Sequence, residues 1–162
     1  MPEITLTPVD YSNPQQAADL VALMDAYAND PMGGGKALSA DVKQRLPKEL
    51  AQRPHAFSVL CYVDEQPAAL INCFEAFSTF RARPLVNIHD VIVASPFRGL
   101  GLSHRLLRAV EDIARQRGCC KLTLEVLEGN TVAQHSYRNF GFSGYELDPA
   151  MGRAIFWQKE LD

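Results

Sequence analysis

The sequence predicts an α+β fold in which a mixed, mainly antiparallel sheet is flanked by helices. Its 162 residues match the usual size of one domain, so a single core is expected. Three runs rich in β-branched and aromatic residues follow one another with short connections, which is typical of neighbouring strands. Segments with apolar residues at helical spacing lie on both sides of these runs. No repeat, linker or low-complexity tract divides the chain, so we expect one domain over residues 1–162.

The N-terminal segment is predicted to form a short strand followed by a helix. Residues 4–9, ITLTPV, alternate threonines with apolar residues, as a strand does. Pro14 follows Asn13 and is expected to open the helix. The apolar stripe of this helix recurs at helical spacing and consists of Leu20, Val21, Met24 and Tyr27.

A glycine-rich loop and a second helix come next. The stretch NDPMGGGKALS contains three consecutive glycines, which predict a tightly turned or mobile loop. Its part from Met32 to Lys36 either closes over a substrate or simply connects two helices. Ser39 is a suitable N-cap for a helix over residues 40–51. Pro47 lies inside that helix and is expected to kink or split it.

Three strands are predicted in the middle of the chain, over residues 56–64, 68–77 and 85–93. A turn around residues 65–67 separates the first two strands. The stretch FSTFRARP is expected to be the exit loop of the second strand. The third strand, LVNIHDVIV, ends where a proline stops the pairing.

A long amphipathic helix is predicted over residues 99–118. Its apolar stripe consists of Leu102, Leu106, Leu107, Val110 and Ile113. Glu111 and Arg115 are spaced to pair on the solvent side, and Gly118 is a suitable residue to end the helix. The remaining elements are predicted as a strand KLTLEVL, a shorter helix NTVAQHSYRNF stopped by Gly141, and a closing strand GRAIFWQKEL.

Composition and charge exclude several classes of function. A net charge of −3 without a local Lys/Arg cluster predicts no binding of nucleic acid. No apolar run approaches the roughly 20 residues needed to cross a bilayer, so no membrane segment is expected. The first residues lack the pattern of a secretory signal, and we expect a cytoplasmic protein. The four cysteines have no CxxC spacing and the four histidines form no metal-binding pair, so no metal is expected.

The junction HDVIVASPFRGLGLSHRLL is the strongest functional signal in the sequence. A strand ends there, and Gly99 and Gly101 precede a long helix. Glycines let successive backbone N–H groups turn toward one point, and a helix N-terminus adds unpaired donors and a positive dipole end. This combination favours a phosphate or pyrophosphate, to which Arg98 can add a charge-assisted bond.

Other interpretations of these glycines fit less well. The sequence contains no GxxxxGK string followed by Ser or Thr, as a P-loop requires. A dinucleotide-binding turn needs a third glycine where His104 stands. An ordinary strand-to-helix turn remains possible on the spacing of two glycines alone.

Residues 98–103, RGLGLS, resemble the R/Q-x-x-G-x-G/A pyrophosphate loop of GNAT acetyltransferases, with Ser103 where the family has Gly or Ala. The stretch EGNTVAQHSYRNFGF resembles the second motif of the family, and the similarity spans residues 56–142. The resemblance implies acetyl-CoA as the co-substrate. The residues that it implies for binding are Val91, Ile92, Val93, Arg98, Gly99, Leu100, Gly101, Leu102, Ser103, Asn130 and Tyr137.

The resemblance also implies catalytic roles. Tyr137 stands where the family usually supplies the general acid, and Asn130 where it has a residue that contacts the pantetheine arm or caps the helix. The general base stays open among His89, Asp90 and Glu75. We expect His89 and Asp90 to point to opposite faces of their strand, because side chains alternate.

The acceptor and the assembly are less well defined. The stretch HDVIVASPFRGLGLS is similar to diamine and polyamine N-acetyltransferases, which have a glutamate where this chain has His89. A small amine is therefore expected, with a protein lysine or N-terminus as an alternative acceptor. A domain of this fold that binds acyl-CoA without catalysis is the rival from another class. Family members often pair through C-terminal strands, and the apolar GRAIFWQKEL makes a homodimer an expectation here.

Overall fold

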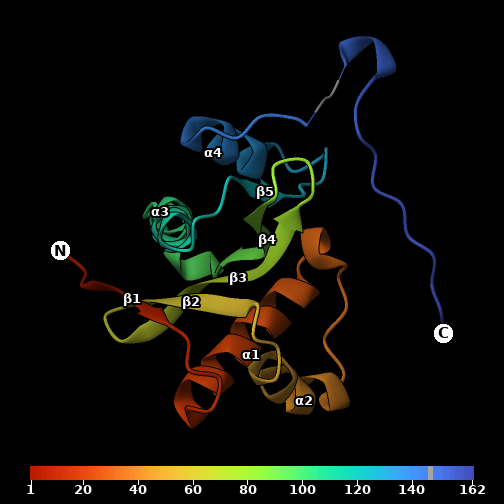
Figure 1. Ribbon diagram of the computed structural model, residues 1–162. Helices are drawn as coiled ribbons and strands as arrows, with labels where there is room; N and C mark the ends of the chain where they lie inside the picture. The colour runs from red at the N-terminus through yellow and green to blue at the C-terminus, as the bar shows by residue number, and fades with distance from the viewer. Residues whose placement is uncertain (146–147) are drawn as a thin grey trace.

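In the computed structural model, which describes residues 1–145 and 148–162, a five-stranded sheet lies between two layers of helices (Figure 1). The strands are β1 (Ile4–Pro8), β2 (Ala56–Val63), β3 (Gln66–Ser78), β4 (Arg83–Val93) and β5 (Leu122–Leu124). They are adjacent in sequence order; β1 to β4 are antiparallel, and β5 is parallel to β4. The predicted mixed, mainly antiparallel sheet is confirmed.

Helices cover both faces of the sheet. They are α1 (Pro14–Asn29), α2 (Ala40–Ala51), α3 (Leu102–Gln116) and α4 (Thr131–Phe140), with the 3₁₀ turns η1 (Pro31–Gly33), η2 (Ser95–Phe97) and η3 (Pro149–Met151). Helices α1 and α2 lie on one side of the sheet, and α3 and α4 lie on the other (Figure 1). We call these sides the α1 face and the α3 face.

The core has one apolar cluster on each face. On the α3 face, the stripe of α3 packs against alternate residues of β2, β3 and β4, among them Val59, Cys61, Ile71 and Val86. On the α1 face, the cluster consists of Leu20, Leu23, Leu50, Leu60, Leu70 and Ile92. Because both faces of the central strands are buried, these strands read as nearly continuous apolar runs in the sequence.

Caps position the helices where the sequence predicted them. Asn13 accepts a bond from the amide of Gln16, and Ser39 accepts one from Val42. Helix α2 continues through Pro47, so the expected split is absent. Proline removes one helical hydrogen bond, but here its ring is buried, and this packing offsets the loss.

A bulge in β4 changes the orientation of two candidate residues. Asn72 pairs with Asp90, but the next residue, Cys73, pairs with Ile88, so His89 is an extra residue in the strand. The His89 ring contacts Phe74, and the Asp90 carboxylate accepts a bond from Asn72; both partners face α1. The expectation that His89 and Asp90 point to opposite faces is therefore wrong, because the bulge interrupts the alternation.

The C-terminal segment also differs from the prediction. Strand β5 has three residues instead of seven, and the expected closing strand is absent, since residues 153–162 have no regular structure. Ile155, Phe156 and Trp157 are 71%, 75% and 79% exposed. In Figure 1 this segment runs outside the sheet, and its backbone pairs with no strand among residues 1–145 and 148–162. In the part of the chain that the structure describes, no helix has the length and apolar character that a membrane span requires.

Candidate active site

The parallel strands β4 and β5 separate early. They pair only at residues 86–88 of β4, opposite residues 122–124. From residue 89 to residue 93, the edge of β4 that faces β5 has no backbone partner among the described residues. This opening is the first part of the junction that the sequence analysis identified, so free backbone groups are available to an extended ligand just before the two glycines.

The glycine turn gives the start of α3 an open cradle of amides. Gly99 and Gly101 have φ angles of 87° and 73°, which residues with a Cβ rarely adopt. A Cβ atom at either position would meet no atom within 4 Å, so a ligand can approach the backbone closely. The amides of residues 99–104 have no hydrogen-bond partner within the described chain, and no side chain caps α3. Together they leave a group of unpaired N–H donors at a helix N-terminus, the arrangement that favours an anion.

Three predicted residues of the junction hold this cradle in place. Arg98 donates to the carbonyl of Val93 over 3.3 Å and lies 3.5 Å from Asp30, at the start of η1. Leu102 is buried in the core, whereas Leu100 is 42% exposed. The hydroxyls of Ser103 and Ser136 are 3.4 Å apart and connect α3 to α4.

The strand that leads into the cradle is anchored through its side chains. Ile92 is buried on the α1 face, and Val91 and Val93 pack against the α3 cluster. Because these side chains face the two clusters, only the backbone of this part of β4 is free for a ligand.

Helix α4 presents Tyr137 to the same region. Asn130 caps this helix by accepting a bond from the amide of Ala133 over 3.2 Å, which agrees with the capping half of its predicted role. Burial raises the pKa of Tyr137 to about 12, and the nearby Tyr27 adds to this shift. The phenol therefore keeps its proton at neutral pH, as a general acid must.

Tyr27, at the end of α1, connects the two sides of the site. Burial raises its pKa, and the charges of Asp90 and Asp30 raise it further. Since Tyr27 also affects Tyr137, it lies within electrostatic range of both carboxylates and of the buried phenol. The sequence showed Tyr27 only as part of an apolar stripe. The only sign in the sequence of a functional role for Tyr27 was that this last residue of the stripe carries a hydroxyl group.

The three candidates for the general base have different surroundings. Asp90 accepts a bond from the Asn72 amide over 3.0 Å. His89 is exposed, with its ring edge against Phe74 and ring centres 5.5 Å apart. Glu75 is bound to Arg117, near the end of α3, at 3.2 Å and to His55 at 3.5 Å. The structure thus brings His89 and Asp90 to one face and leaves Glu75 in an ion-pair network apart from them.

The glycine-rich loop folds tightly onto the end of α1. The amides of Gly35 and Lys36 donate to the carbonyls of Asp30 and Ala28. At Gly33 a Cβ atom would lie 2.0 Å from the Tyr27 carbonyl oxygen, so the backbone needs glycine there. Of the two predicted forms, the loop adopts the tight turn.

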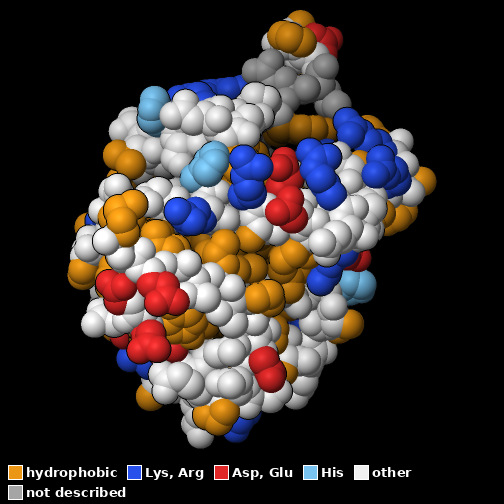
Figure 2. Space-filling view, turned by 90° about the vertical axis from the view of Figure 1, so that its left-hand side faces the viewer, with side chains coloured by type: hydrophobic (Ala, Val, Ile, Leu, Met, Phe, Trp, Pro, Cys, Tyr) orange, Lys and Arg blue, Asp and Glu red, His pale blue; other side chains and the backbone are white. Residues whose placement is uncertain are grey.

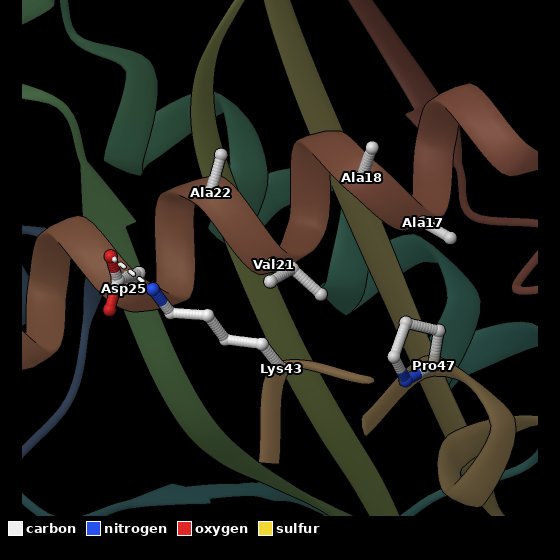
Figure 3. A pocket seen from close by; sticks show the side chains of 7 residues that line it. All are labelled: Ala17, Ala18, Val21, Ala22, Asp25, Lys43 and Pro47. Carbon is white, nitrogen blue, oxygen red and sulfur yellow. Dashed lines mark ion pairs between the residues drawn. The ribbon is translucent and has the colours of Figure 1, made fainter. Parts of the chain in front are cut away.

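Two surface hollows lie outside the region just described. One, of about 400 Å³, is lined only by α1 and α2; Figure 3 shows its Asp25 and Lys43, which are 3.2 Å apart at one end. The other, of about 330 Å³, lies beside α3 and β1. Figure 2 shows the face at the left of Figure 1, where basic, acidic and histidine side chains gather above an apolar band. Among the described residues, no three His, Cys, Asp or Glu side chains are grouped to hold a metal.

Comparisons with known proteins identify the family of this architecture. A sequence model described as the acetyltransferase (GNAT) family matches residues 20–142. The streptothricin acetyltransferase of Streptomyces lavendulae is 40% identical over 78 residues, which cover 48% of this chain and 41% of that protein. A thialysine N-epsilon-acetyltransferase of Bos taurus is 30% identical over 66 residues, or 41% of this chain and 38% of that protein. The chain thus spans about two fifths of the length of these curated relatives.

Solved structures show the same fold along nearly the whole chain. The aminoglycoside N-acetyltransferase AAC(6′)-Iy in complex with CoA gives a TM-score of 0.76 at 19% identity, covering 98% of this chain and 96% of that one. The aminoglycoside acetyltransferase meta-AAC0020 from an uncultured soil sample, in complex with sisomicin, gives 0.80 at 13% identity, covering 98% and 97%. At such identities the likeness concerns the fold.

Proposed function

This chain belongs to the GNAT family of acetyltransferases, and we propose that it transfers an acetyl group from acetyl-CoA to a primary amine of a small molecule. The observation that carries this proposal is the row of amides at residues 99–104, which have no hydrogen-bond partner among the described residues and come shortly after the unpaired edge of β4. A pyrophosphate with an extended arm attached has the shape and charge for both features.

The donor is assigned to the α3 side of the sheet. The amides from Gly99 to Ser103 bind the pyrophosphate, and the backbone of residues 91–93 binds the pantetheine arm along the open edge of β4. Asn130, whose side-chain NH₂ is not used in capping α4, is available to the same arm. Arg98 adds a positive charge, because its pair with Asp30 is exposed and long.

The chemical step removes two protons from the acceptor ammonium and supplies one proton to the leaving sulfur. The acceptor ammonium loses a proton, directly or through water, to His89 or Asp90, which share the α1 face. The acceptor nitrogen then forms a bond to the acetyl carbon while the carbon–sulfur bond breaks. Tyr137, protonated because burial raises its pKa to about 12, donates its proton to the leaving sulfur. The second proton leaves the acceptor nitrogen as the amide forms and returns to the Tyr137 oxygen, directly or through water, so that CoA leaves as a thiol and the product as a neutral amide. Glu75 is not assigned a role, since its carboxylate is bound to Arg117 and His55.

We assign a small, cationic amine as the acceptor. Asp30 and Asp90 both raise the pKa of Tyr27, so both carboxylates lie within electrostatic range of one phenol, which in turn affects Tyr137. Two carboxylates close to the proposed acid attract a molecule with more than one ammonium group. The relatives are named for streptothricin and thialysine, which agrees with this class.

A homodimer through the C-terminal segment is the proposed assembly. Four large apolar side chains of this segment are 71% to 89% exposed: Ile155, Phe156, Trp157 and Leu161. The edge of β5 away from β4 is unpaired in the described chain. A second copy that exchanges this segment would cover both features.

The test is release of CoA from acetyl-CoA with a panel of acceptors: streptothricin, thialysine, sisomicin, spermidine and a lysine peptide. Turnover with one of the small amines supports the proposal. Turnover with the peptide alone would move the assignment to a protein acetyltransferase. Acetyl-CoA binding without turnover on any acceptor would favour the rival, a sensor domain that binds acyl-CoA.

A further inference from the structure

A chain of hydrogen-bonded side chains crosses the α1 face of the sheet and ends at Asp90. The Tyr11 hydroxyl, in front of α1, lies 2.8 Å from the Ser58 hydroxyl of β2. Ser58 donates to Asn72 Oδ1 of β3 over 2.6 Å, and Asn72 Nδ2 donates to Asp90 Oδ2 of β4 over 3.0 Å. Ser58 and Asn72 are only 2% and 4% exposed. Three polar side chains thus connect three adjacent strands inside an otherwise apolar layer.

The donor and acceptor of each hydrogen bond in this series follow from the donors and acceptors that each side chain has. Ser58 has one hydroxyl proton, which it donates to Asn72 Oδ1, so Tyr11 must be the donor to Ser58. With its oxygen held by Ser58, Asn72 can only turn its NH₂ group toward Asp90. The opposite orientation of the amide would place its oxygen against a carboxylate oxygen. The hydroxyls of Tyr11 and Ser58 and one N–H of Asn72 therefore all point toward Asp90, and the other Asn72 N–H points to Met24 Sδ, so the amide that meets this carboxylate is held in one orientation.

Asp90 itself is left half free by this arrangement. Its Oδ2 is occupied by Asn72, and the described residues offer Asp90 no other hydrogen bond or ion pair. The bulge at His89 places this carboxylate on the α1 face, where its charge reaches Tyr27. A fixed carboxylate with one free oxygen is suited to binding an ammonium group.

We propose that Asn72, aimed by Ser58, is a positioning residue that holds Asp90 in the orientation in which its carboxylate docks the ammonium group of the acceptor. The inference rests on the proposed function and makes it more specific. It assigns Asp90 to binding the acceptor, and thereby leaves proton removal to His89 or to water. Asn72 does not contact the acceptor and acts only through Asp90.

The kinetic test uses whichever acceptor of the panel is turned over. Asn72→Ala is expected to raise the KM of the acceptor about 10-fold, since hydrogen bonds to charged groups are the stronger ones. Ser58→Ala should raise it less, and Tyr11→Phe least, because each acts one bond further away. The KM of acetyl-CoA should stay unchanged in all three, since the donor binds elsewhere.

Two controls separate positioning from general damage. Cys73→Ala removes a buried side chain next to Asn72 on β3 but on the α3 face, so it should lower Tm without changing the KM of the acceptor. In an Asp90→Asn background, Asn72→Ala should have no further effect on the KM of the acceptor. An Asn72→Ala effect that persists without Asp90, or that acts equally on both KM values, would overturn the inference.

A measurement without acceptor keeps this test separate from the proposed function. The side-chain NH₂ resonances of Asn72 in a ¹⁵N–¹H spectrum should move with pH in the wild type and lose this movement in Asp90→Asn. If they do so while no amine is acetylated, the hydrogen-bond chain stands and the proposed function fails. If the Asn72 resonances respond to pH in the same way in the wild type and in Asp90→Asn, the inference is overturned, whether or not the protein acetylates an amine.

Discussion

The two faces of the sheet are buried by different means. On the α3 face, every fully buried side chain in the cluster is apolar, and α3 contributes a continuous stripe of leucines and valine. The α1 face also has an apolar cluster, but Ser58, Asn72 and Asp19 are buried there too, each with a hydrogen-bond partner. Apolar burial stabilises without much directional requirement, whereas a buried polar group must be satisfied in one geometry.

This difference corresponds to the two substrates that we propose. The α3 side offers backbone amides on a rigid apolar support, which suits a large anionic donor. The α1 side offers fixed charge at Asp90, which suits a cationic acceptor. The two sides meet near two phenols, because Tyr27 of α1 lies within electrostatic range of Tyr137 of α4. Variants on each side should therefore have separable effects.

The largest effect is expected from Tyr137→Phe, at the meeting point of the two sides. Loss of the phenolic proton should lower kcat by about 100-fold to 10,000-fold while the affinity for acetyl-CoA stays unchanged. Because burial raises the pKa of Tyr137 to about 12, the phenol stays protonated between pH 7 and 10 and should cause no loss of rate there. Steady-state kinetics and calorimetric titration measure both quantities. A variant with wild-type kcat would remove Tyr137 from the mechanism.

The next effect concerns the donor alone. Gly101→Glu places a side chain at a φ of 73° and a negative charge in the amide cradle, so the affinity for acetyl-CoA should fall at least about 100-fold. Gly118→Glu is the matched control, because Gly118 has the same φ of 73° at the other end of α3 and also has open space around it. It should cost similar stability and leave the affinity intact. Equal losses of affinity in both variants would mean that strain, not the cradle, is responsible.

The sequence predicted the glycine turn before α3 far better than the arrangement of polar side chains on the α1 face. The cradle depends on local features, glycines before an amphipathic stripe, and these are visible in a short window. The chain from Tyr11 to Asp90 joins residues up to 47 positions apart in single steps, so no local pattern reveals it. The bulge at His89 depends on the pairing of β3 with β4, which a single strand does not encode. The C-terminal segment was predicted as a strand because it is apolar. A strand also needs a neighbouring strand to pair with, and β5 has only three residues.

A smaller effect should appear in the dependence of stability on alkaline pH. Burial raises the pKa of Tyr62, which contacts Asp19 on the α1 face, and of Tyr137 on the α3 side, each to about 12. An unfolded tyrosine loses its proton near pH 10, so between about pH 10 and 12 the folded state binds more protons than the unfolded state. The contribution of each phenol to the free energy of unfolding is therefore fully retained below pH 10 and falls as pH rises to 12, by about 1–2 kcal/mol for Tyr137 and by less for the more exposed Tyr62, whose interactions water screens.

Urea unfolding at several pH values from 9 to 11.5 measures this decline. Tyr62→Phe and Tyr137→Phe should each make the decline shallower, one variant on each side of the sheet. Comparing slopes rather than absolute stabilities removes the effect of the lost hydrogen bond between Tyr62 and Asp19. Slopes identical to the wild type in both variants would show that neither phenol is desolvated as described.

The smallest effect is expected from replacing Glu75, a carboxylate that does not lie on the α1 face with Asp90. Glu75 belongs to β3, as Asn72 does, but its carboxylate forms ion pairs with Arg117 and His55 and makes no contact with Asp90. Glu75→Gln should cost no more than about 1 kcal/mol of stability and leave kcat and both KM values unchanged. Asp90→Asn, a carboxylate-to-amide change of the same kind, should instead raise the KM of the acceptor. If Glu75→Gln lowered kcat while Asp90→Asn did not, the face of the sheet would not decide which carboxylate serves the reaction, and the division between the two faces would have to be abandoned.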